Sequence, residues 1–224
     1  MKPIDHAHFF AAYEAAFKPL SDSQRDGLGF LLACLEGDDL VTDIRWAAYM
    51  LATTKWECGD TWRPIEEVGK GKGHSYGEPV NGHVYFGRGF CQLSWAGNYS
   101  NMGNVLHVDL LRRPELALDP PVAYRIMSVG MRNGMFTGVG LGRFINDHLC
   151  DYVGARKIIN GIDQAERIAG FATKLEACLH ASAPELTDFD RATILSSLDI
   201  AADIDVSPQH DDIATADTEP PAKS

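Results

Sequence analysis

The strongest structural signal in this chain is the segment YFGRGFCQLSWAGNY at residues 85–99. It combines a Gly-Arg-Gly turn, aromatic side chains and two amide side chains, Gln92 and Asn98. Glycine permits tight turns and close approach of a ligand to the backbone. Aromatic rings offer apolar faces with polar edges, and amides both donate and accept hydrogen bonds. The segment therefore predicts a polar and aromatic binding surface of the kind that suits sugar rings.

Four glutamates lie shortly before this segment, at Glu57, Glu66, Glu67 and Glu78. Cleavage of a glycosidic bond needs one carboxylic acid to protonate the leaving oxygen and a second carboxylate to act on water or on the sugar. Glu57 is expected at the C-terminal end of a helix, where the last carbonyl groups disfavour an ionised side chain, as do the apolar neighbours Trp56 and Trp62. Glu57 therefore suits the general acid, and a turn after it brings either Glu66 or Glu67 back as the second carboxylate.

The rest of the chain predicts a mainly α-helical domain. Apolar residues recur at helical spacing, and Ser21 with Gln24 has the spacing of a capping box. The segment from Gly69 to Gly89 is glycine-rich and predicts loops and short extended pieces. The expected helices cover approximately residues 3–17, 21–37, 43–58, 105–113, 120–135, 151–159 and 164–180.

Charge divides the chain into two parts. From Ala181 onward, ten acidic and two basic residues give −8, which leaves −3 of the formal net charge of −11 for residues 1–180. We expect one domain over residues 1–182 and an acidic tail over residues 183–224 that is largely disordered.

Composition excludes several classes of function. The acidic balance argues against nucleic-acid binding, which needs clustered lysine and arginine. The 224 residues hold no apolar run of membrane-spanning length, so no stable membrane insertion is expected, and the N-terminus has no apolar secretory core. Five widely spaced cysteines predict neither a disulfide framework nor a zinc site. We expect a monomer made in the cytoplasm, with no metal or cofactor.

Four motifs together resemble glycoside hydrolase family 19, which includes chitinases and phage endolysins with a lysozyme-like fold. The motifs span residues 47–67, 85–99, 110–120 and 155–161, in the same order as in the family. The resemblance implies a mainly α, lysozyme-like domain with two lobes, a central cleft and a glycine-rich loop region.

The resemblance also implies roles for individual residues. Glu57 takes the place of the general acid, and Glu67 is the preferred second carboxylate, with Glu66 close behind. Arg88 is expected to be structural and to pair with carboxylates. The residues that take substrate-contacting places are Tyr85, Gln92, Ser94, Asn98, Tyr99 and Asn160.

The expected function is hydrolysis of β-1,4 bonds in a polymer that contains N-acetylglucosamine, with peptidoglycan as the expected substrate and chitin as the alternative. The protein would act on the cell wall after its release from the cell, and inversion is the expected stereochemistry. Two departures from the family pattern, Trp56 before the acid and Cys58 after it, motivate a rival hypothesis. In that hypothesis the same fold forms a non-catalytic wall-binding or virion structural protein.

Two other constellations carry weaker signals. Cys58 with His74 or His83 could form a thiol nucleophile and its base, but no third orienting residue supports it. The Gly-Lys-Gly-Lys-Gly segment at residues 69–73 lacks the strand and helix of a phosphate-binding loop and is expected to be a flexible loop.

Overall fold

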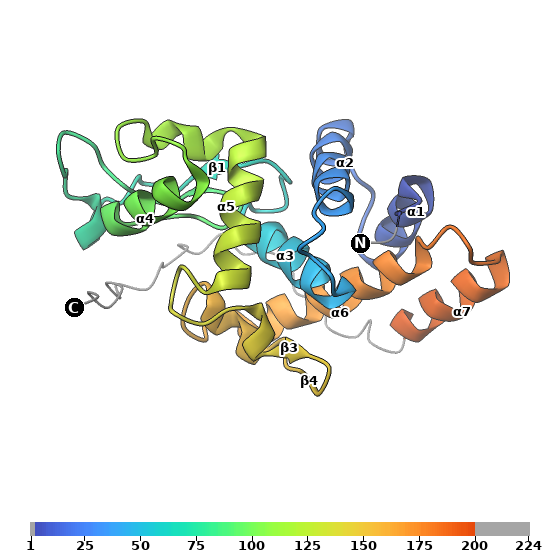
Figure 1. Cartoon of the computed structure of the whole chain (residues 1–224). Coiled ribbons are helices and arrows are strands. Elements are labelled where there is room, and N and C mark those ends of the chain that lie inside the picture. Colours follow the sequence, from blue (N-terminus) through green and yellow to red (C-terminus); the bar gives the residue numbers. More distant parts are fainter. Residues whose placement is uncertain (1–2, 200–224) are drawn as a thin grey trace. The chain divides into compact units, whose positions relative to one another are not determined.

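The structure, a computed structural model, describes residues 3–199 (Figure 1). Its chain divides into two compact units. Within the described residues, the first unit contains residues 3–62 and 164–199, and the second contains residues 63–163. Helices dominate both units and the strands are only two residues long, which confirms the mainly α prediction.

The described part of the first unit consists of five helices. Helix α6 packs against α3 and α1, and α7 packs against α6 and α1 (Figure 1). The bounds of these helices are α1 His6–Ala16, α2 Asp22–Glu36, α3 Ile44–Glu57, α6 Ala165–Ala181 and α7 Asp188–Asp199.

Each of the first three of these helices begins with a polar capping residue. Asp5 accepts a hydrogen bond from the His8 backbone at the start of α1. Ser21 and Gln24 form the predicted capping box of α2, and Asp43 caps α3 by accepting from the Arg45 backbone. Such caps satisfy backbone N–H groups that lack a partner inside the helix.

Helix α3 is the central element of the first unit. Every residue of its middle part, from Ala47 to Lys55, is buried. A helix that is buried on all sides must be apolar or small around its whole circumference, or must pair its polar groups internally. Lys55, which lies two residues before Glu57, carries a charge and therefore needs such an internal partner.

Helix α7 lies inside the segment that the sequence analysis assigned to an acidic tail. Arg191 anchors this helix, because its buried guanidinium donates to the backbone carbonyls of Ala181, Ala183 and Leu186. One arginine guanidinium can donate hydrogen bonds to several carbonyls at a helix end. The helical periodicity of a sequence does not reveal such contacts. The remainder of the predicted tail, residues 200–224, lies outside the described residues.

Over residues 63–163, the second unit contains two helices, two small antiparallel sheets and several 3₁₀ turns. In the first sheet β1 pairs with β2, and in the second β3 pairs with β4. The bounds are β1 Ile65–Glu66, η1 Ser75–Gly77, β2 Arg88–Gly89, α4 Ala96–Leu106, η2 Pro114–Leu118, α5 Pro120–Asn133, η3 Leu141–Arg143, β3 Ile145–Asn146, β4 Leu149–Cys150 and η4 Gly154–Ile158.

Two of the expected helices differ from the structure. The helix expected at residues 105–113 instead begins at Ala96 and ends when His107 adopts a left-handed conformation. The helix expected at residues 151–159 is a five-residue 3₁₀ turn, η4. Both differences occur beside turns, where the helical periodicity of a short segment is weakest.

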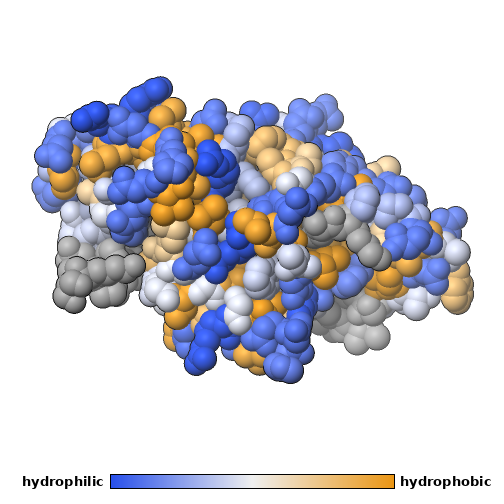
Figure 2. Space-filling model, in the orientation of Figure 1, coloured by the Kyte–Doolittle hydropathy of each residue, from blue (hydrophilic) through white to orange (hydrophobic). Residues whose placement is uncertain are grey.

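The surface contains apolar residues in separate patches among hydrophilic ones, on the face drawn in Figure 2. Individual large apolar side chains are exposed, such as Phe189 and Ile162. Scattered exposure of this kind is ordinary for folded proteins. Among residues 3–199, no helix combines the length and the apolar character that crossing a membrane would require.

Candidate active site

Glu57 is the last residue of helix α3 and is only 2% exposed. Its position at the C-terminal end of a helix agrees with the place that the sequence predicts. The preceding residue, Trp56, is half-buried and has the Arg167 guanidinium 5.2 Å from its ring centroid. Trp56 therefore has a packing role within the first unit, between α3 and α6, which accounts physically for one departure from the family pattern.

Cys58, the second departure, caps α3 and is fully buried. Its backbone N–H donates to Thr54, and its carbonyl accepts from the Thr61 hydroxyl at 2.8 Å. A reactive thiol is normally at least partly accessible and lies in an electropositive environment. The burial of Cys58 argues against a thiol nucleophile and favours a structural residue that completes the helix end.

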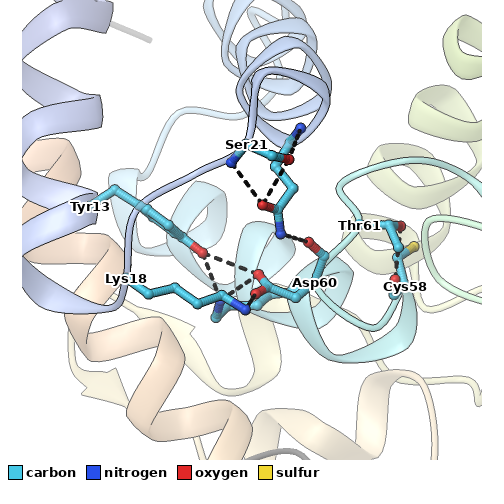
Figure 3. Close-up of polar contacts among 8 residues, drawn as sticks. Tyr13, Lys18, Ser21, Cys58, Asp60 and Thr61 are labelled. Atoms are coloured by element: carbon cyan, nitrogen blue, oxygen red, sulfur yellow. Dashed lines mark hydrogen bonds and ion pairs between the residues drawn. The ribbon is translucent and has the colours of Figure 1, made fainter.

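The turn after Glu57 is held by a partly buried polar network that was not predicted from the sequence (Figure 3). Asp60 forms ion pairs of 2.6 Å with both Lys55 and Lys18. Lys55 also donates to the Tyr13 hydroxyl at 2.6 Å, and Gln24 donates to the Asp60 carbonyl at 2.8 Å. The turn is thereby tied to α1, to α2 and to the segment between them.

Charge and burial act on this network in opposite directions. Burial alone would raise the pKa of Asp60, but the charges and hydrogen bonds of Lys55 and Lys18 hold that pKa below its ordinary value. Burial lowers the pKa of Lys55, against the opposing effect of Asp60. Burial and the nearby Asp60 charge raise the pKa of Tyr13. The arrangement is a desolvated ion pair with a neutral phenol beside it.

Glu66 lies in the second unit, on β1, opposite Arg88 of β2. One carboxylate oxygen is 2.7 Å from the Lys70 ammonium and the other is 3.7 Å from Arg88 Nε. The Glu66 side chain is 35% exposed. Glu66 is therefore a carboxylate flanked by two cations that solvent or a substrate can reach.

Glu67 has a different environment, although it is the next residue. It is 6% exposed, and both of its oxygens accept hydrogen bonds, from the Tyr76 hydroxyl and from the Gly87 N–H, each at 2.9 Å. Its own N–H donates to the Gly87 carbonyl at 2.8 Å. Glu67 is thus a buried clamp that joins the glycine-rich loop, through Tyr76, to the Gly-Arg-Gly turn.

Arg88 has the structural role that the sequence predicts. Its guanidinium carbon lies 3.5 Å from the centroid of the Phe86 ring, and its Nη1 donates to the Tyr99 hydroxyl at 3.1 Å. Together with the Glu66 ion pair, these contacts make Arg88 the centre of the β1–β2 region. Stacking on an aromatic face suits a planar guanidinium better than an ammonium group.

Tyr85 and Tyr99, to which the resemblance gives substrate-contacting places, lie in the core of the second unit. They are 1% and 0% exposed. The Tyr85 hydroxyl donates to the Leu111 carbonyl at 2.7 Å, and the Tyr99 hydroxyl donates to the Phe86 carbonyl at 2.9 Å. Burial raises the pKa of both phenols. Both side chains belong to the packing of the second unit, and an aromatic-rich motif alone cannot distinguish a core residue from a contact residue.

The other predicted contact residues are polar side chains of the second unit. Gln92 is buried and its Nε2 donates to the carbonyls of Ile65 and Gly89. Asn98 is 9% exposed and its Oδ1 has no hydrogen-bond partner among the described residues. Ser94 and Asn160 are half-buried. Asn98 therefore offers an acceptor that the fold leaves unused, whereas Gln92 chiefly joins β1 to the loop after β2.

A separate cavity of about 360 Å³ lies beside α4 and the loop after it. Its polar lining comes from Ser100, Asn104, His107, Asp109 and Arg112. None of the candidate carboxylates lines this cavity. Among the described residues, no cluster of three or more histidine, cysteine or acidic side chains has an arrangement suited to a metal ion.

Several supporting residues have signals that sequence reasoning did not use. Lys55 and Asp60 lie on either side of Glu57, and a lysine in an otherwise apolar helix requires a buried partner. Tyr76 is the single tyrosine within the glycine-rich segment 69–84. Lys70 is four residues after Glu66, a spacing at which opposite charges pair on a helix. The intervening Gly69 argues against a helix here, so the pairing was not predicted.

Comparison with known proteins gives partial matches. No family model matches the sequence. A 45-residue segment is 56% identical to an endochitinase of Arabidopsis thaliana and covers 20% of this chain and 17% of that protein. A segment of the same length is 47% identical to Endochitinase 1 of Theobroma cacao and covers 20% of this chain and 14% of that one. The match therefore spans less than a fifth of the length of these curated relatives.

A solved structure of a chitinase C mutant shares the fold. The TM-score is 0.55 at 23% identity, over 78% of this chain and 77% of the other. The partial matches to endochitinases agree with the resemblance that the sequence motifs indicate, and the likeness to the solved structure shows that the fold is the helical fold of that chitinase.

Proposed function

We propose that the chain is a glycosidase of the family 19 type that hydrolyses β-1,4 bonds between N-acetylglucosamine units, with chitin as its substrate. The observation that carries the proposal is Glu57, a buried carboxyl at the end of α3 in a fold shared with a chitinase. The partial matches to plant endochitinases support the same class of polymer.

The proposed chemistry uses two carboxyl groups in different roles. The Glu57 carboxylic acid gives its proton to the leaving glycosidic oxygen while the bond to the anomeric carbon breaks. A second carboxylate takes a proton from the attacking water, so that the anomeric carbon is inverted. After product release, the two carboxyl groups exchange the proton with solvent and return to their starting states.

Glu66 is the second carboxylate in this proposal, in preference to Glu67. A general base must accept a proton from water, and its oxygens must therefore be reachable. Glu66 is 35% exposed, whereas both oxygens of Glu67 are occupied by Tyr76 and Gly87. Lys70 and Arg88 hold the two Glu66 oxygens in place by ion pairs of 2.7 Å and 3.7 Å.

Chitin is the substrate in this proposal, in place of peptidoglycan, which was the substrate expected first from the sequence. The similar proteins are named as endochitinases and a chitinase, and the chain carries a formal net charge of −11. Chitin is neutral, whereas peptidoglycan carries carboxylates on its peptide stems and would be repelled by an acidic protein.

The test is hydrolysis of soluble N-acetylglucosamine oligomers by Glu57→Gln and Glu66→Gln variants. Each substitution removes the ionisable group and keeps the shape, so kcat should fall by about 10²- to 10⁴-fold. Glu78→Gln is the matched control, because Glu78 is exposed on the loop before β2 and has no proposed role. Full activity in Glu57→Gln would show that the acid is assigned wrongly.

The same preparation separates the non-catalytic rival. Wild-type protein is incubated with insoluble chitin and, in parallel, with insoluble peptidoglycan, and both bound protein and released reducing ends are measured. Binding to either polymer without release would favour a wall-binding protein. Release from peptidoglycan alone would restore the first expectation of the sequence analysis.

A further inference from the structure

The chain on either side of Glu57 is joined by two contacts between Lys55 and Asp60. The Asp60 N–H donates to the Lys55 carbonyl at 2.9 Å, and the two side chains form an ion pair of 2.6 Å. Glu57 lies inside this closed loop of six residues. Any rearrangement of the loop therefore changes the direction in which the Glu57 side chain leaves the end of α3.

The backbone of this turn is in a conformation that L-residues rarely adopt. The φ angles are +63° at Asp60 and +58° at Trp62. A bulky residue such as Trp62 is disfavoured there, and such outliers persist only where the surroundings hold them. The surroundings are specific, because Gln24 holds the Asp60 carbonyl and α2 approaches Trp62 closely at Gly27.

The ion pair that closes the loop is itself costly to bury. The side chains of Lys55 and Asp60 are 7% and 16% exposed, and four aromatic rings surround the ammonium within 4.6–5.6 Å, from Tyr13, Phe17, Trp62 and Phe171. Replacing a buried pair by apolar residues is often neutral or stabilising. Stability alone is therefore a weak reason for a charged pair at this point, next to a candidate acid.

We infer that Lys55 and Asp60 are positioning residues that hold the Glu57 carboxyl in the orientation required for proton donation. The inference rests on the proposed function, since it assigns the pair to the acid of that reaction. Lys55 and Asp60 affect the reaction only indirectly, through the turn that carries Glu57. The pair thus converts a strained turn into a fixed support for one side chain.

This role predicts a dependence on the leaving group. Natural oligosaccharides leave as poor alkoxides and need the proton of the acid. A nitrophenyl glycoside leaves as a stable phenolate and needs little protonation. A variant that misplaces the acid should therefore lose much of its activity on the natural substrate and little on the nitrophenyl substrate, whereas loss of folded protein reduces both activities equally.

The experiment compares Lys55→Met, Asp60→Asn and the double variant with Lys18→Met. Lys18 pairs with the same carboxylate at the same 2.6 Å, but its side chain is 55% exposed, so its variant is the matched control. The double variant leaves no unpaired buried charge from the pair, and it serves as the test if a single variant does not fold. All assays are run well below the melting temperature of each variant, on a chitin oligosaccharide and on its nitrophenyl glycoside.

We expect kcat on the oligosaccharide to fall by about 10- to 100-fold with KM unchanged, because small misplacements of a catalytic group have effects of this size. On the nitrophenyl glycoside the loss should stay below about threefold, and Lys18→Met should resemble wild type on both. Equal losses on the two substrates, or no loss on either, would overturn the inference.

The Glu57→Gln variant, assayed on the same two substrates, distinguishes failure of the positioning role from failure of the proposed function. If its activity is not restored on the nitrophenyl glycoside, Glu57 is not the acid and the proposed function fails. If its activity is restored while the Lys55 and Asp60 variants lose activity equally on both substrates, the proposed function stands and only the positioning role fails.

Discussion

Glu66 and Glu67 show how two adjacent identical residues acquire different environments. In an extended segment successive side chains point to opposite sides, so one residue meets cations and solvent while the other enters the protein. Glu66 is 35% exposed and Glu67 is 6% exposed. The difference arises from contacts with Tyr76 and Gly87, which are distant in sequence from the glutamates.

The clamp formed by Glu67 predicts different effects for two substitutions. Glu67→Gln keeps an acceptor for the Gly87 N–H and can donate to a rotated Tyr76 hydroxyl, so it should cost about 1 kcal/mol and leave most activity. Glu67→Leu leaves two buried donors without acceptors, each at about 1–3 kcal/mol. Urea unfolding and hydrolysis assays measure both effects. Complete inactivity of a stably folded Glu67→Gln would return the base role to Glu67.

The sequence predicts Glu57 at a helix end but leaves the choice between Glu66 and Glu67 open. Helix ends follow from local patterns of apolar residues, caps and glycines, which a single sequence displays. The environments of Glu66 and Glu67 depend on a loop that returns after many residues. For the same reason the buried states of Tyr85 and Tyr99 were not predictable from an aromatic motif.

At the scale of elements, helix α2 contains two glycines that have different neighbours. A Cβ at Gly29 would make an ordinary contact of 3.6 Å with the Phe10 ring, whereas a Cβ at Gly27 would lie 2.3 Å from the Trp62 carbonyl oxygen. Gly27 therefore lets α2 approach the turn after Glu57, while Gly29 has no such role.

This contrast predicts opposite effects of alanine in one helix. Gly29→Ala should stabilise the protein by about 0.5–1 kcal/mol, because alanine favours the helix. Gly27→Ala should destabilise it by about 1–3 kcal/mol, because the new methyl group must displace backbone. Chemical denaturation of the two variants beside wild type gives both values. A stabilised Gly27→Ala variant would contradict the close approach of α2 to Trp62.

The elements themselves were predictable to different degrees. The capping box of α2 and the bounds of α3 are local features, and both were anticipated from the sequence. Helix α7 was not, because its anchor is one buried arginine that binds three carbonyls of the preceding segment. Long-range hydrogen bonds of this kind leave no periodic trace in a sequence.

At the scale of the whole molecule, net charge gives a test of the substrate that needs no mutation. The chain carries −11, of which −8 comes from Ala181 onward by the count of ten acidic and two basic residues. Between like-charged molecules, added salt weakens repulsion, and from about 0.01 M to about 0.1 M the screening length falls from about 30 Å to about 10 Å.

Hydrolysis of neutral chitin oligomers should therefore change little over this range of salt. Hydrolysis of peptidoglycan, if it occurs, should become faster as salt screens the carboxylates of the polymer from those of the protein. Initial rates on both substrates, measured at constant pH, give the two slopes. A chain that ends after Asp199 lacks six acidic residues and one basic residue, and the same count leaves it with −6. Its salt dependence on peptidoglycan should be weaker, and an unchanged slope would show that net charge does not govern the encounter with the polymer.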